Sequence, residues 1–264
     1  LLSQSIKVLI DKSLSKVKLS KVPIVSPHKI IKESDLVIAI GGDGTMINCS
    51  RKFGVEGIPI LGINLGNLGF LNDIDPKDLT ESILGVIAGD YIEDERLFLK
   101  ASFKDQKTKL TSDIALNEAV IHSGEIAKLI EYDLLINDTF VYRQRSDGLI
   151  ISTPTGSTGY SLSGGGPIIH PKVDCFILLP MLPLSLSSSP LIIDINSIIK
   201  VRLIGEKKNA YLSLDSQTSF LLKGEKEIQI SKSGNKLNLI HPSGHNFFKA
   251  CRNKLGWSSA YLNS

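Results

Sequence analysis

The sequence predicts an α/β region at the start of the chain and a longer, β-rich region after it. Early runs of β-branched and aliphatic residues show no polar alternation, and they alternate with stretches that have apolar residues at helical spacing. Later runs are short, closely spaced and separated by Gly, Asn, Asp and Pro. That pattern is typical of packed β domains.

The first region contains three predicted strands and two predicted helices. The strand-like runs lie at 6–10, 36–40 and 58–63, and the helical stretches lie at 46–53 and 79–88. Each run ends in turn-forming residues, as strands buried on both faces of a parallel sheet do. Alternation of strand and helix predicts a parallel sheet with helices on its faces.

The second region contains many short strands. They are predicted at 97–103, 114–122, 128–136, 140–142, 149–152, 176–179, 191–193, 200–204, 211–214, 227–231 and 237–240. Residues 184–190 are predicted to form a loop. The tail at 246–255 has its apolar side chains on one helical face, which predicts a helix packed on the core.

We expect two domains. Residues 1–92, completed by a C-terminal helix over 246–264, are predicted to form an α/β nucleotide-binding domain. Residues 93–245 are predicted to form a β-rich domain.

Composition excludes several classes of protein. A net charge of +3 is too small to indicate a nucleic-acid ligand. No apolar stretch reaches the ~20 residues that span a bilayer, so no membrane partner is expected. The three cysteines, Cys49, Cys175 and Cys251, are far apart and lack metal-ligand spacing, which favours free thiols and a cytoplasmic location.

A Gly-Gly-Asp-Gly-Thr turn at 41–45 follows the strand predicted at 36–40. Ligands of open α/β sheets bind at such strand-to-helix turns, where backbone N–H groups can hold phosphates. The phosphate-binding residues are predicted to be Gly41, Gly42, Gly44 and Thr45. Asp43 could accept a proton from an attacking hydroxyl or help to hold a metal ion. The alternative is an ordinary solvent-facing turn.

Two other phosphate motifs are excluded. The chain has no P-loop, and its glycines at 62, 66 and 69 lack the spacing of the dinucleotide fingerprint. Gly66 and Gly69 belong to a second glycine-rich segment, 64–71, which follows the strand predicted at 58–63 and should therefore lie beside the first turn. The alternative is a glycine-rich turn with Phe70 in the core.

Asn117 and Glu118 lie in an otherwise apolar strand predicted at 114–121. Burying both is costly unless partners are present, so ligand groups such as ribose hydroxyls and an adenine edge are predicted partners. The alternative is a strand end with both side chains in water.

A loop rich in Gly, Ser and Thr at 153–167 follows the strand predicted at 149–152. It is predicted to wrap a polar, polyhydroxylated ligand, with backbone and hydroxyl groups as donors and Tyr160 as a stacking face. The alternative is a loop with a structural role only. His241 and His245 are four residues apart, but Pro242 and Gly244 between them prevent a shared helix face, and no metal site is predicted.

These segments, in this order, resemble the NAD kinase family along nearly the whole chain. The turn at 41–45 also occurs in lipid kinases and phosphofructokinases. Asn117-Glu118 and residues 146–167 are more specific to NAD kinases, and residues 237–242 and 254–257 are similar to bacterial members.

The resemblance implies a Rossmann-like α/β domain with a parallel sheet, a β-sandwich-type NAD-binding domain, and a homodimer or homotetramer. It implies phosphorylation of the adenosine ribose 2′-hydroxyl of NAD by ATP, with a divalent metal such as Mg²⁺ and with Asp43 as proton acceptor. The implied dinucleotide-binding residues are Asp43, Gly44, Asn117, Glu118, Lys128, Arg145, Asp147, Thr158, Gly159, Tyr160, Ser161, Leu162, Ser163 and Gln217.

The chain departs from the family pattern in three places. Relatives begin with another strand and helix before residues 6–10. They usually carry a histidine near Leu184 and an arginine near Ser189, and alanine is commoner at Gly159. Two alternatives remain: a lipid-type or diacylglycerol kinase that shares the turn, and a non-catalytic NAD(P)-binding module.

Overall fold

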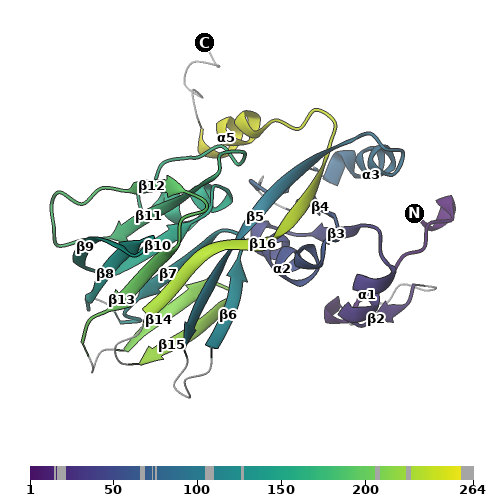
Figure 1. Ribbon diagram of the computed structural model, residues 1–264. Helices are drawn as coiled ribbons and strands as arrows, with labels where there is room; N and C mark the ends of the chain where they lie inside the picture. The colour runs from purple at the N-terminus through teal and green to yellow at the C-terminus, as the bar shows by residue number, and fades with distance from the viewer. Residues whose placement is uncertain are drawn as a thin grey trace, which may run out of the picture. The chain divides into compact units, whose positions relative to one another are not determined.

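The computed structural model (Figure 1) describes residues 1–14, 16, 22–65, 69–72, 74, 76–104, 110–125, 128–205, 209–223 and 227–256. The chain divides into two compact units. Unit 1 comprises Leu1–Glu95 and Leu237–Ser264, and unit 2 comprises Arg96–Lys236. No described helix is both long enough and apolar enough to cross a membrane.

Unit 1 is an α/β structure. Its elements are η1 (Leu2–Gln4), β1 (Ile10–Asp11), η2 (Lys12–Leu14), β2 (Ile24–Val25), α1 (Pro27–Glu33), β3 (Val37–Ile40), α2 (Asp43–Lys52), η3 (Gly54–Glu56), β4 (Ile60–Ile63), η4 (Pro76–Asp78), α3 (Leu79–Ile87) and α5 (Phe247–Leu255). Strand β3 pairs in parallel with β4, which pairs in parallel with the last part of β16 (Glu227–Pro242). The predicted parallel sheet is confirmed.

Helix α2 begins directly after the glycines because Gly42 is its N-cap. Its buried side is formed by Met46, Ile47 and Ser50, and Ser50 lies about one turn after the other two. The core of the sheet includes Leu61 of β4 and Ile240 of β16. Helix α2 itself contacts β3 and β4.

The start of unit 1 differs from the prediction. The strand predicted at 6–10 is wrong over most of its length, because β1 begins at Ile10 and, among the described strands, pairs with β2 alone. Helix α1 was not predicted, since Ile30 is its only buried residue and leaves little periodicity. Helix α5 is confirmed up to Leu255, and the predicted extension to residue 264, with Trp257, lies outside the described residues.

Unit 2 is built mainly of antiparallel strands. Its elements are β5 (Tyr91–Lys104), β6 (Leu110–Ala115), β7 (Glu118–His122), β8 (Ile130–Ile136), β9 (Thr139–Ser146), β10 (Gly148–Ser152), η5 (Thr155–Thr158), α4 (Tyr160–Ser163), β11 (Cys175–Met181), β12 (Leu191–Asp194), β13 (Ile199–Leu203), β14 (Asn209–Leu214), β15 (Thr218–Lys223) and the first part of β16. Strands β5 and β16 each contain a boundary between the units.

Two sheets share the core of unit 2. One has the order β12-β11-β10-β7-β14-β15, and the other includes β16-β13-β8-β9. A single hydrophobic cluster contains Ile121 and Leu149 from the first sheet and Leu134 and Val201 from the second. The predicted β-rich second domain is confirmed, with sandwich packing.

Three details of unit 2 correct the prediction. The run at 114–122 is two strands, β6 and β7, with Asn117 at the break. The runs at 227–231 and 237–240 are one continuous strand, β16. Strand β15 was missed because three of its six residues are exposed and Leu222 is its one fully buried residue. The loop predicted at 184–190 contains neither helix nor strand.

Candidate functional site

In unit 1, the Gly-Gly-Asp-Gly-Thr turn lies where β3 leads into α2, and Asp43 is the first residue of that helix. Gly41 has a φ of +154°, and a Cβ there would lie 2.5 Å from Thr45 Oγ1, so only glycine fits without strain. Gly42 and Gly44 are exposed and face open space. The position of this turn at the start of α2, together with the helix dipole, makes it suited to an anion.

The Asp43 carboxylate is held by three donors. Phe70 N–H donates to Oδ2 over 3.1 Å, Leu71 N–H to Oδ1 over 3.3 Å, and Lys254 Nζ to Oδ2 over 3.1 Å. Its side chain is 28% exposed. Two backbone groups and a cation therefore fix this carboxylate.

The second glycine-rich segment meets the first turn, as its position after β4 predicted. A Cβ at Gly69 would overlap Asp43 Oδ1, so glycine is required for this approach. Asn72, which is fully buried, donates from Nδ2 to the Gly41 carbonyl over 2.9 Å. Phe70 is buried, in accord with its alternative core role, and residues 66–68 lie outside the described residues.

Lys254 was missed by sequence reasoning as a site residue. It lies in the last turn of α5, and its ammonium also lies 4.4 Å from the centroid of the Phe70 ring. A cation over an aromatic face is favourable, and the same cation pairs with Asp43. No local signal connects Lys254 with a residue more than 200 positions earlier.

In unit 2, Asp215 organises the break between β6 and β7. Its buried carboxylate accepts from the N–H groups of Leu116 (2.7 Å), Asn117 (2.7 Å) and Glu118 (3.1 Å). Asp215 and Ser216 have φ near +50° and form the turn between β14 and β15. Asp215 was not predicted as a site residue, although its short polar side chain suits such a turn.

Glu118 is buried, with 5% of the residue exposed. Burial, and secondly the nearby Asp215 carboxylate, raise the pKa of Glu118 to about 8, and a hydrogen bond from Tyr160 N–H partly opposes this. Glu118 Oε2 and Asn117 Oδ1 are buried without a hydrogen-bond partner among the described residues. The alternative in which both side chains lie in water is wrong for Glu118.

The loop at 153–167 is more ordered than predicted and contains η5 and α4. Thr153 Oγ1 donates to the Leu116 carbonyl over 2.6 Å, and Ser157 Oγ donates to the Pro154 carbonyl over 2.6 Å. Thr158 Oγ1 donates to the Thr155 carbonyl over 3.2 Å. These hydroxyls therefore stabilise the loop itself, and their contact with a ligand stays a prediction.

The same loop leaves other predicted groups available. Tyr160 is 45% exposed, and Ser161 Oγ is buried without a partner among the described residues. A Cβ at Gly159 would lie 3.1 Å from both Asn117 Nδ2 and Glu118 Oε2, so the structure brings this loop against the polar pair. Leu162 is partly buried and Ser163 is exposed.

The remaining predicted residues lie elsewhere in unit 2. Exposed Lys128 pairs with Glu125, and half-exposed Arg145 lies 4.0 Å from Glu131. Asp147 lies between β9 and β10, and its N–H donates to the Met181 carbonyl. Gln217 follows the Asp215 turn, and its N–H donates to the Leu214 carbonyl over 2.9 Å.

Comparisons with known proteins agree with this arrangement. Residues 10–91 match the family described as the ATP-NAD kinase N-terminal domain, and residues 116–242 match the ATP-NAD kinase C-terminal domain. An NAD kinase from Teredinibacter turnerae is 42% identical over 263 residues, covering 98% of this chain and 89% of the relative. One from Marinobacter nauticus is 48% identical over 238 residues, covering 89% and 81%.

Solved structures lead to the same family. Yeast NADH kinase, complexed with NADH, has a TM-score of 0.87 at 26% identity, with 97% of this chain and 80% of that chain covered. An NAD kinase from Archaeoglobus fulgidus, in complex with ATP, has a TM-score of 0.72 at 28% identity, with 94% and 96% covered. With both family domains matched and a relative 42% identical along almost its full length, the chain belongs to the ATP-NAD kinase family.

Proposed function

We propose that this chain is a NAD kinase that transfers the γ-phosphoryl group of ATP to the 2′-hydroxyl of the adenosine ribose of NAD, giving NADP. Membership of the family supports the reaction class. The observation that carries the assignment is the fixed Asp43 carboxylate at the first residue of α2, inside a turn suited to phosphates.

Asp43 acts as the proton acceptor. A carboxylate has about four lone-pair positions, and three described donors occupy part of them. Two of these donors bind Oδ2, so Oδ1 retains capacity for the substrate hydroxyl. The fixed orientation lowers the entropy that would be lost on reaching a reactive geometry.

The phosphates of ATP bind at the exposed turn of Gly42, Gly44 and Thr45. The remaining lone-pair position of Asp43 is reserved for the substrate hydroxyl, so a Mg²⁺ ion at this turn would be held by phosphate oxygens and water. A divalent ion bound there supplies charge neutralisation on the triphosphate.

Asn117 and Glu118 recognise the dinucleotide. Both present buried acceptor atoms, and with a pKa near 8 Glu118 is largely protonated at neutral pH and can donate as well as accept. Tyr160 supplies an exposed ring for stacking. Lys128, Arg145, Asp147 and Gln217 contribute further contacts.

We further propose a cytoplasmic location, supported by three free cysteines. A homodimer or homotetramer is proposed from the family resemblance alone. The kinase proposal is tested by incubating the purified chain with γ-labelled ATP, Mg²⁺ and either NAD or diacylglycerol. Label is expected in NADP alone. Label in the lipid, or in neither acceptor while NAD still binds, would refute the assignment.

A further inference from the structure

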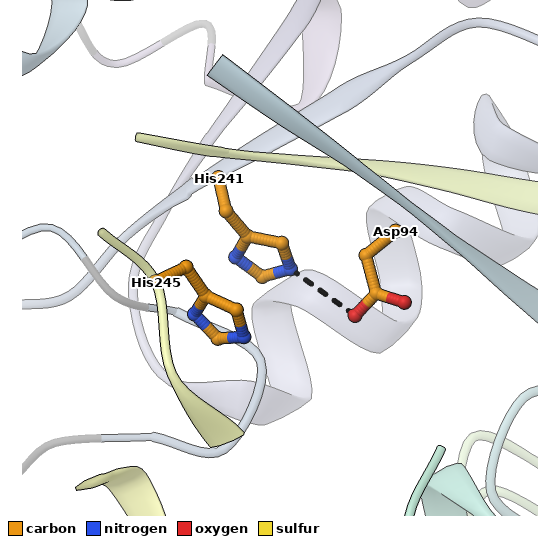
Figure 2. A group of neighbouring side chains, drawn as sticks. All are labelled: Asp94, His241 and His245. Carbon is orange, nitrogen blue, oxygen red and sulfur yellow. Dashed lines mark ion pairs between the residues drawn. The ribbon is translucent and has the colours of Figure 1, made fainter. Parts of the chain in front are cut away.

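Three side chains able to bind a metal ion meet in unit 1, apart from the turn at 41–45. They are Asp94 on β5, His241 near the end of β16 and His245 in the turn before α5 (Figure 2). One ligand atom from each lies within 4.8 Å of the others. His241 Nε2 and Asp94 Oδ2 are 3.5 Å apart.

The backbone explains how the two histidines meet. Their spacing excludes a shared helix face, but a turn replaces the helix, because Gly244 has a φ of +92° and His245 N–H donates to the Pro242 carbonyl over 3.2 Å. The rings stack with centroids 3.8 Å apart and planes 15° apart. Figure 2 shows Asp94 beyond the edge of this stack, on the side of His241 Nε2.

We propose that Asp94, His241 and His245 form a binding site for one divalent transition-metal ion of the Zn²⁺ class. Two imidazoles and a carboxylate are a common three-ligand set for Zn²⁺, with the fourth position left to water. Two ligand atoms at about 2.0–2.2 Å from a tetrahedral ion are roughly 3.4 Å apart, close to the observed 3.5 Å.

The burial of two of the three side chains supports a metal site. The His241 side chain is 2% exposed and that of Asp94 is 11% exposed, so the ion would lie in a medium where its attraction to the carboxylate is strong. His245 is only partly buried and belongs to a glycine-containing turn, so its ring can rotate out of the stack and direct a nitrogen at the ion.

The site would also fix the start of α5. Asn246, the residue after His245, is the N-cap of that helix and accepts from Lys249 N–H over 3.1 Å. The same helix carries Lys254, which pairs with Asp43. The metal would thereby stabilise the element that holds Asp43, and this role is separate from any ion bound to ATP.

The site is tested by equilibrium dialysis of the full, chelator-treated chain against Zn²⁺ alone, with the bound metal measured by elemental analysis. One equivalent is expected for the wild type. His245→Ala should weaken binding at least about 100-fold, because even loss of a group supporting a ligand costs 10–100-fold. His245 is the chosen position because it is the least buried of the three ligands, and thermal denaturation without metal checks that the variant folds.

Two control variants test whether the metal ion binds at another histidine or at a cysteine. His28→Ala removes an exposed histidine and Cys49→Ser removes the most accessible thiol, and both should keep the wild-type affinity. A Co²⁺-loaded wild type should show the visible absorption of nitrogen and oxygen ligation without thiolate charge-transfer bands. Unchanged binding in His245→Ala, lost binding in Cys49→Ser, or no binding by the wild type would each overturn the proposal.

Discussion

Lys254 Nζ lies 3.1 Å from Asp43 Oδ2 and so joins the last turn of α5 to the first residue of α2. Both side chains are about one-third exposed, so the pair contributes less than about 1 kcal/mol to the free energy of unfolding. Its larger effect is positional, because it restricts the rotamer of Asp43.

Lys254→Met should therefore lower kcat about tenfold, because an acceptor that is less well fixed reaches the reactive geometry less often. Steady-state kinetics and thermal denaturation measure the two effects separately. Lys249→Met, an exposed change on the same helix, is the control and should leave kcat unchanged. Equal loss in both variants would assign the effect to helix α5 as a whole.

Asp43→Asn should cut turnover by about 100-fold or more while NAD binding stays nearly unchanged. The amide oxygen can still accept from Phe70 or Leu71, so the turn should keep its shape. Calorimetric titration with NAD and single-turnover kinetics check the two statements. Wild-type turnover in this variant would remove Asp43 as the proton acceptor.

The raised pKa of Glu118 predicts a stability that depends on pH. The folded-state pKa of about 8 exceeds the ordinary value of 4.5, so the folded state binds the proton more tightly than the unfolded state does. The stabilisation is complete below pH 4.5 and is lost as the pH rises towards 8. Since one pKa unit corresponds to about 1.4 kcal/mol, the loss is of the order of a few kcal/mol.

Glu118→Gln carries no titrating proton and should lack this loss. Urea denaturation of both proteins at several pH values between 5 and 9 measures the difference in the free energy of unfolding. As the pH rises, the free energy of unfolding of the variant should increase relative to that of the wild type. A difference that does not change with pH would mean that Glu118 titrates normally.

Asp215→Ala should destabilise unit 2 by about 3 kcal/mol, since three backbone N–H groups lose their acceptor in a buried place. NAD affinity should also fall, because Asn117 and Glu118 lie at the break that Asp215 organises. Asp194→Ala, which removes an exposed Asp that also accepts a backbone N–H, is the matched control and should cost under 1 kcal/mol. Chemical denaturation of the two variants measures both losses in the free energy of unfolding.

The sequence predicted the strands that bury several apolar residues. Strand β4 is buried along its whole length, and β8 and β13 each bury several apolar residues, whereas β15 and β1 each bury one. Asn117 and Glu118 could be recognised because polar residues interrupted an apolar run. Asp215 and Lys254 could not, because their contacts join residues far apart in the sequence.

Gly69→Ala tests the contact between the two glycine-rich segments. The added Cβ would overlap Asp43 Oδ1, so either the carboxylate or the backbone that donates to it must move. A shift of about 1 Å at a catalytic group can cost on the order of 100-fold in rate, so kcat should fall by about 10- to 100-fold.

Gly85→Ala, in α3 with open space around its Cβ position, is the matched control. It should keep the wild-type kcat and stabilise the helix by about 0.5–1 kcal/mol, because alanine has the higher helix propensity. If Gly69→Ala retains the wild-type kcat, Asp43 does not depend on the position of this segment.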